Sequence, residues 1–203
     1  MRLYLSSFRL GVAAARLRPL AGGPRAVVLA HALDANGRDA RRSGAAAEIA
    51  ALEGLGFRAR EADLYESGPE ALADADLVWV RGGNAFVLRR ALADTGSDLA
   101  IRQLLAEDAI AYGGYSAGCC VLAPDLTGLE GVDDPAPAGE VTWAGLGVLD
   151  RPFVPHVDSP SHPETEQCDG VAARHRAAGR PHWALRDGEV LIVAGDTVEL
   201  VKP

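Results

Sequence analysis

Short apolar runs alternate with longer amphipathic runs along most of the chain, and this alternation restricts the fold more than any other feature. Residues 25–30 and 77–80 are largely apolar, which is typical of strands buried on both faces. Residues 39–55 carry apolar side chains at helical spacing and end at glycines. Strands that alternate with helices predict a three-layer, doubly wound α/β domain around a mostly parallel sheet.

The remaining elements follow from the same patterns. Further strands are predicted at residues 2–5, 57–60, 109–112 and 153–155, and further helices at 84–94, 97–107 and 163–178. C-terminal β-hairpins are predicted from the runs 182–185, 190–193 and 197–201, with turns at Gly188 and Gly195.

Residues 125–139 are acidic and rich in proline and glycine, without any periodicity. Such a segment is typical of a long functional loop, and we expect it to form a lid that restricts the substrate to short molecules. No linker divides the chain, so we expect one domain over residues 1–203.

Charge and cysteine content exclude several function classes. With 20 basic and 28 acidic residues and a net charge of −8, the chain is poorly suited to bind nucleic acid through its phosphates. Three cysteines without zinc-site spacing predict neither a disulfide framework nor a structural metal. No apolar run has the length of a membrane span or a secretory signal. We therefore expect a cytoplasmic monomer or homodimer with no membrane partner.

The strongest local motif is Gly114-Tyr115-Ser116-Ala117-Gly118, which follows a predicted strand and precedes a run compatible with a helix. This is the setting of a nucleophile elbow, a tight turn that lifts a serine hydroxyl out of the sheet. Flanking glycines provide the space that such a turn requires, and the Ala117 N–H is an expected oxyanion donor.

A second glycine cluster, Arg81-Gly82-Gly83-Asn84, ends the strand at 77–80. Loops at the carboxyl ends of parallel strands line the ligand crevice of an open α/β sheet. We therefore expect the Gly83 N–H to be the second oxyanion donor. Asn84 is an expected helix cap and substrate contact.

A catalytic serine requires a base and an acid. Sequence position alone leaves more than one candidate for each. His156, at the end of a short strand, is the favoured base, with His31 as the alternative; we expect His162 and His175 to be solvated and His182 to be structural. Asp187, in a turn before Gly188, and Asp134, in the acidic loop, are the two candidate acids.

These motifs together resemble the S51 serine peptidases, the peptidase E and cyanophycinase group, whose fold is similar to that of class I glutamine amidotransferases. The resemblance rests on Gly82-Gly83-Asn84-Ala85-Phe86, the elbow at 114–118, Pro155-His156 and Leu185-Arg186-Asp187-Gly188. It implies a nucleophile at Ser116, a base at His156 and an oxyanion hole at Gly83 and Ala117. The family's late acid is usually glutamate, so Asp187 is one methylene shorter.

The resemblance also implies a departure in specificity. Where aspartate-specific members have an arginine in a Glu-Thr-Arg element, this chain reads Glu164-Thr165-Glu166. A carboxylate at Glu166 in contact with substrate would repel an acidic side chain, so we expect a preference for neutral or basic N-terminal residues.

The favoured function is therefore a serine peptidase for dipeptides or short peptides that needs neither metal nor organic cofactor. One alternative is an α/β-hydrolase esterase using Ser116, Asp134 and His156, although few residues follow the elbow. The other is a non-catalytic protein with an amidotransferase-like fold. Cys119 and Cys120 fall beyond the elbow and are expected to be buried helix residues, not nucleophiles.

Overall fold

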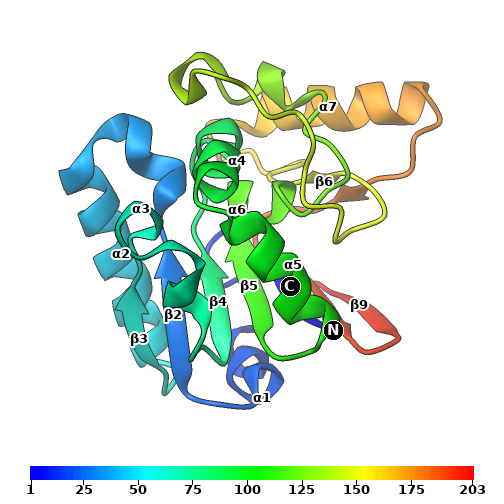
Figure 1. The fold of residues 1–203 in the computed structure, drawn as a ribbon. Helices are drawn as coiled ribbons and strands as arrows, with labels where there is room; N and C mark the ends of the chain where they lie inside the picture. The colour runs from blue at the N-terminus through cyan, green and yellow to red at the C-terminus, as the bar shows by residue number, and fades with distance from the viewer.

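A seven-stranded sheet forms the centre of the computed structural model, which describes residues 1–203 (Figure 1). Its strand order is β3-β2-β4-β5-β1-β8-β9. The bounds are β1 Arg2–Ser6, β2 Arg25–Leu29, β3 Arg58–Glu61, β4 Leu77–Val80, β5 Ala111–Tyr115, β8 Val190–Ala194 and β9 Thr197–Val201. The first five pair in parallel, while β8 pairs antiparallel with both β1 and β9.

Alternate residues of the central strands point into two separate cores, which is why the molecule has three layers. On β4, Val78 and Val80 belong to one core, while Leu77 and Trp79 belong to the other, and all four are fully buried. Because side chains alternate along a strand, a continuous apolar run is stable only when both faces are covered. The mostly parallel, doubly wound α/β fold expected from the sequence is thus the fold observed.

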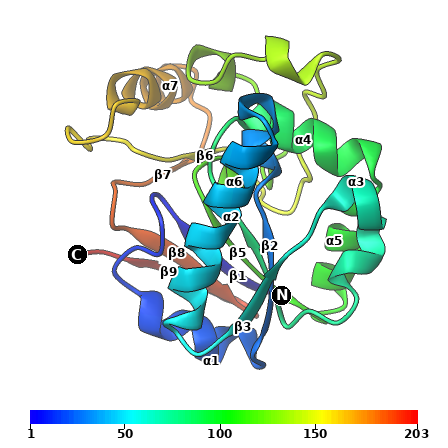
Figure 2. The same cartoon turned by 90° about the vertical axis from the view of Figure 1, so that its left-hand side faces the viewer.

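Helices cover both faces of the sheet (Figure 2). One face is covered by α1 and α2, and the other by α3, α4, α5 and α6. The helices are α1 Leu17–Ala21, α2 Arg38–Glu53, α3 Leu64–Ser67, α4 Ala85–Asp94, α5 Ser97–Ala106, α6 Ala117–Cys120 and α7 Thr165–Ala177. The capping role of Asn84 is observed, since its Oδ1 accepts from the N–H groups of Phe86 and Val87.

The C-terminal segment differs from the expectation at one turn. Gly195 lies in the turn of the β8–β9 hairpin, but Gly188 does not lie in a hairpin. The strand before it, β7 (Trp183–Ala184), instead pairs in parallel with β6 (Phe153–Val154) in a separate small sheet. β8 finds its antiparallel partner in β1, far away in the sequence, and local alternation could not indicate that pairing.

The acidic loop at 125–139 contains two short 3-10 turns, Leu129–Gly131 and Ala136–Ala138. It lies with α7 beyond the carboxyl ends of the parallel strands (Figure 1). Side chains of α4 and α7 hold it: Asn84 Nδ2 donates to the Asp134 carbonyl, and Arg174 donates to the Gly128 carbonyl. No helix in the structure combines the length and apolar character that a membrane crossing requires.

Candidate active site

Three neighbouring strands bring the site together at their carboxyl ends. β4 is followed by Gly82 and Gly83, β5 by Ser116, and β1 by Ser7. Because β4, β5 and β1 are adjacent and parallel, these segments emerge at the same edge of the sheet.

Ser116 lies in a strained turn between β5 and α6. Its φ and ψ are 52° and −121°, values that a non-glycine residue adopts only when its surroundings enforce them. A Cβ on Gly114 would lie 2.6 Å from the Val80 carbonyl oxygen, and one on Gly118 would collide with the same atom. The two glycines of the motif therefore allow the elbow to pack against β4.

The glycine turn after β4 packs directly on this elbow. A Cβ on Gly82 would lie 2.9 Å from that of Ser116, and one on Gly83 would lie 2.7 Å from the Ala32 carbonyl oxygen. Gly83 also has a φ of 143°, which disfavours any other residue. Ala117 begins α6, where first-turn amides have no partner within their helix.

His156 is buried and held in place through its backbone. It follows β6, has a φ of 58° and is 1% exposed. Its N–H donates to Ser7 Oγ at 2.8 Å, and Thr165 Oγ1 donates to its carbonyl oxygen at 2.8 Å. The ring is thus anchored from β1 on one side and from α7 on the other.

The acid that contacts this ring is Asp187. Its Oδ1 lies 2.7 Å from His156 Nδ1 and also accepts from Ser7 Oγ at 2.8 Å. The backbone N–H of Asp187 donates to Ser159 Oγ, which fixes the turn. Burial would raise the pKa of the Asp187 carboxyl, but hydrogen bonds from His156 and Ser7 hold it below its usual value.

The other sequence candidates for base and acid lie elsewhere. Asp134 is exposed, and its carboxylate caps the loop by accepting from the Ala136 N–H. His31 is fully buried and accepts from the Leu64 N–H, and burial lowers its pKa to about 4. His175 is buried beside His182, contrary to the expectation that it is solvated.

Ser116 and His156 line one small pocket with a volume of about 270 Å³. The other lining residues are Phe8, Arg9, Arg81, Gly82, Gly83, Tyr115, His162, Pro163 and Glu164. This pocket therefore combines the serine, the imidazole and the glycine turn, together with both signs of charge.

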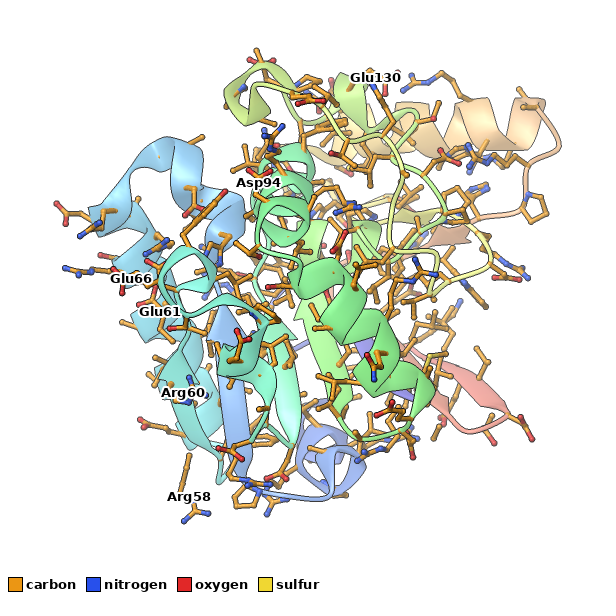
Figure 3. The ribbon with its side chains drawn as sticks, in the orientation of Figure 1. Arg58, Arg60, Glu61, Glu66, Asp94 and Glu130 are labelled. Carbon is orange, nitrogen blue, oxygen red and sulfur yellow. The ribbon has the colours of Figure 1, made fainter.

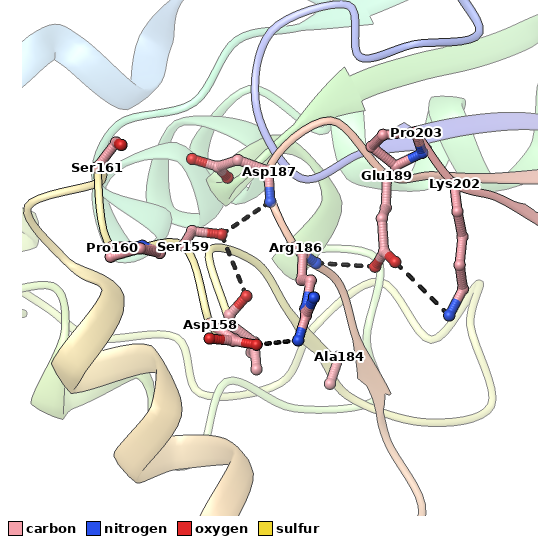
Figure 4. Close-up of a pocket in the computed structure, with 11 residues that line it drawn as sticks. Asp158, Ser159, Pro160, Ser161, Ala184, Arg186, Asp187, Glu189, Lys202 and Pro203 are labelled. Atoms are coloured by element: carbon pink, nitrogen blue, oxygen red, sulfur yellow. Dashed lines mark hydrogen bonds and ion pairs between the residues drawn. The ribbon is translucent and has the colours of Figure 1, made fainter.

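A larger hollow of about 900 Å³ lies behind the acid (Figure 4). It shares only Asp187 with the constellation, and its lining includes two ion pairs, Asp158 with Arg186 and Glu189 with Lys202. The smaller pocket is the candidate active site because it alone contains the groups needed for nucleophilic chemistry.

Comparison with known proteins identifies the family. The family model for peptidase family S51 matches residues 39–201. The chain belongs to peptidase family S51. Uncharacterized peptidases of Listeria innocua and Listeria monocytogenes are 31% and 32% identical over 114 and 122 residues. These matches cover 54% and 58% of this chain and 54% and 59% of the relatives, so the chain spans little more than half the length of the curated relatives it matches.

Solved structures show the same fold. A candidate peptidase E from Listeria monocytogenes superposes with a TM-score of 0.80 at 22% identity, covering 100% of this chain and 98% of that one. A peptidase from an acI-B1 actinobacterium gives a TM-score of 0.73 at 16% identity, covering 100% and 87%. The S51 chain thus shares its fold with these two proteins.

Two residues of this S51 chain that were expected to contact substrate do not line the pocket. Glu166 is exposed on α7 and does not line the pocket, because the buried side of the helix carries Cys168 and Val171. The pocket carboxylate is Glu164, two residues earlier. Asn84 also lies outside the lining, since its side chain caps α4 and binds the Asp134 carbonyl.

Sequence reasoning missed His162 and Ser7. His162 was expected to be solvated, but it is half-buried and stacks on His156, with ring centroids 3.5 Å apart. The positive φ angles of His156 and Asp158 turn the chain back so that the two rings meet. Ser7 is fully buried between base and acid, and its only sequence signal is its place after β1.

His156, His162 and Glu164 offer ligand atoms within 4.8 Å of one another in the pocket of this S51 chain. The two rings are parallel to within 3°. The donor lone pair of an imidazole lies in the plane of its ring, and two parallel planes share no point, so the two lone pairs cannot both point directly at one ion as tetrahedral coordination requires. The stacked rings therefore do not fit a metal site in this arrangement.

Proposed function

We propose that the protein is a serine peptidase that cleaves dipeptides and other short peptides. The observation that carries the proposal is the 2.7 Å contact between Asp187 Oδ1 and His156 Nδ1, in a site whose pocket also holds Ser116 on a strained elbow. An acid on Nδ1 leaves Nε2 as the nitrogen that accepts a proton from a nucleophile.

In this mechanism the Ser116 hydroxyl attacks the scissile carbonyl while His156 Nε2 takes its proton. Asp187 keeps the ring in the required tautomer and stabilises the imidazolium that forms. The N–H groups of Gly83 and Ala117 stabilise the oxyanion of the tetrahedral intermediate. His156 then protonates the leaving amine, and water releases the acyl group by the same route.

Pocket size and charge support short substrates. A volume of about 270 Å³ is at the small end of ligand sites. Arg9 and Arg81 provide positive charge in the same pocket as the Glu164 carboxylate. A dipeptide carries one ammonium and one carboxylate close together, so its termini complement this lining. Glu166 lies outside this lining, so its carboxylate gives no reason to exclude substrates with an acidic N-terminal residue.

The direct test is labelling with a fluorophosphonate followed by peptide mapping. We expect the label on Ser116, loss of the label in Ser116→Ala, and full labelling in the matched control Ser161→Ala, which removes an exposed serine near the site. Hydrolysis of Ala-Ala is expected to exceed that of Ala tetrapeptides. A folded protein that neither takes the label nor cleaves any peptide would instead indicate a non-catalytic binding protein.

A further inference from the structure

A buried carboxylate lies directly behind the nucleophile elbow. Glu48, in the middle of α2, is 7% exposed. Its Oε2 accepts from Trp79 Nε1 of β4, and its Oε1 accepts from the Tyr115 hydroxyl of β5, both at 2.8 Å. Tyr115 immediately precedes Ser116, so this one side chain ties α2 to the two strands that carry the elbow and the glycine turn.

The same helix holds Arg81, which lines the catalytic pocket. Arg81 Nε lies 3.6 Å from Glu48 Oε1, and its Nη1 donates to the Gly82 carbonyl at 2.7 Å. Gly44, one helical turn before Glu48, makes room for this side chain and for Leu33, since a Cβ there would lie 2.6 Å from Leu33 Cδ1 and 3.0 Å from Arg81 Nε. α2 thus leaves space beside Gly44 for the Arg81 side chain and places the Glu48 carboxylate near its guanidinium.

Arg81 keeps 26% of its side chain exposed despite these contacts. A guanidinium has five N–H donors, and the bond to Gly82 uses one, so donors remain for a ligand in the pocket. Arg9 differs, because it is exposed and its guanidinium carbon lies over the Phe8 ring, 5.2 Å from the ring centroid. A cation already held in one orientation loses less conformational entropy when it binds an anion.

We propose that Arg81 is a specificity-determining residue that binds a carboxylate of the peptide substrate, and that Glu48 and Gly44 are positioning residues for it. This inference rests on the proposed function, because it takes the pocket to be the peptide site. The carboxylate is either the C-terminus of a dipeptide or an acidic side chain beside the scissile bond. Guanidinium and carboxylate form paired, charge-assisted hydrogen bonds that an amide in place of the acid cannot form.

Two matched pairs of compounds separate the sources of the carboxylate. Ala-Ala against Ala-Ala amide tests the C-terminus, and Asp-Ala amide against Asn-Ala amide tests the side chain. Binding to Ser116→Ala by calorimetry and hydrolysis by the unmodified protein are measured for all four. We expect at least one acid to be preferred over its neutral partner by about tenfold or more in both measurements.

In Arg81→Gln that preference is expected to fall to within about threefold, mainly through KM. Arg81→Lys is expected to recover part of it. Glu48→Gln is expected to reduce the preference in the same direction while Ser116 still takes the fluorophosphonate; if that variant does not fold, Gly44→Ala, whose Cβ would crowd Arg81 as well as Leu33, is measured instead and is expected to reduce the preference too. Arg58→Gln controls for net charge, because Arg58 is exposed at the amino end of β3, remote from the pocket (Figure 3).

Equal binding of acid and neutral partner in both pairs would overturn the assignment, as would a preference that survives Arg81→Gln. The two proposals can fail separately. Suppose that the unmodified protein neither hydrolyses peptides nor takes the label, while Ser116→Ala binds the acid better than its neutral partner and loses this preference when Arg81 is also replaced. That result would support the role of Arg81 and refute only the proposed function.

Discussion

His162 stacks face to face on His156, with ring centroids 3.5 Å apart and planes within 3° of parallel. Phe8 packs edge-on against both rings, at 5.9 Å and 5.3 Å. Burial, and then the charge of His156, lowers the pKa of His162, while Asp187 and Glu164 act in the opposite direction. The lowered pKa favours the neutral form of His162, and its ring limits the rotation of the proposed base.

We expect His162→Ala to lower kcat about 3- to 10-fold, because the aromatic contact that orients His156 is lost. His162→Phe keeps a flat ring and is expected to retain most of kcat. It also removes a second proton-binding ring, so the acid limb of its kcat/KM profile should be shallower than in the unmodified protein. Steady-state kinetics from pH 5 to 9 measures both effects. Equal losses in the two variants would contradict a role for the stack.

Asp187→Asn is expected to lower kcat by about 10³- to 10⁴-fold, since the amide cannot hold His156 in the tautomer that accepts a proton. The carboxyl pKa is lowered in the folded protein, so its stabilising effect is present at neutral pH and is lost as the pH falls through the folded value. The loss of thermal stability in Asp187→Asn should therefore shrink toward acidic pH. Asp134→Asn is the control. An equal loss of activity in this variant would indicate that Asp134 is the catalytic acid.

Gly83→Ala tests the proposed oxyanion turn. The new Cβ would lie 2.7 Å from the Ala32 carbonyl oxygen at a φ of 143°, so the turn must shift. We expect kcat to fall about 10²-fold, which is the usual loss when one oxyanion donor is misplaced. Gly170→Ala, on α7 with ordinary contacts, is expected to leave kcat unchanged. An active Gly83→Ala variant would exclude this amide from the oxyanion hole.

Asp133 ties the acidic loop to the first turn of α4, where its Oδ2 accepts from the Ala85 N–H at 2.8 Å. Burial raises its pKa to about 6, although the Ala85 bond lowers it. Folding therefore favours the protonated carboxyl, and this stabilisation is complete at pH 4 or below and is lost as the pH rises through about 6.

We accordingly expect Asp133→Asn to increase the free energy of unfolding at pH 7.5 by about 1–2 kcal/mol, because the neutral amide keeps an acceptor without the buried charge. The gain should disappear below about pH 5. Denaturant unfolding at several pH values, with Asp134→Asn alongside, measures the difference. A loss of stability independent of pH would mean that the charge of Asp133 stabilises the loop.

The sequence was sufficient for the type and order of most elements. β4 has the predicted bounds, and the main helices begin and end within two residues of the expected positions. The reason is that burial of one face of a helix, or of both faces of a strand, determines the spacing of apolar residues in the local sequence. The elbow could also be read locally, because its strained turn needs glycines within two residues of Ser116.

Only the tertiary structure places Asp187, and not Asp134, against His156, puts Glu166 outside the pocket and brings His162 onto His156. It also revealed Ser7, which is 149 residues from the histidine that it binds and 180 from the aspartate. Which side chains meet depends on how β1, β5, β6 and the last turn pack around one edge of the sheet. A hydrogen bond between groups so far apart in the chain leaves no local pattern, and so only the folded arrangement defines it.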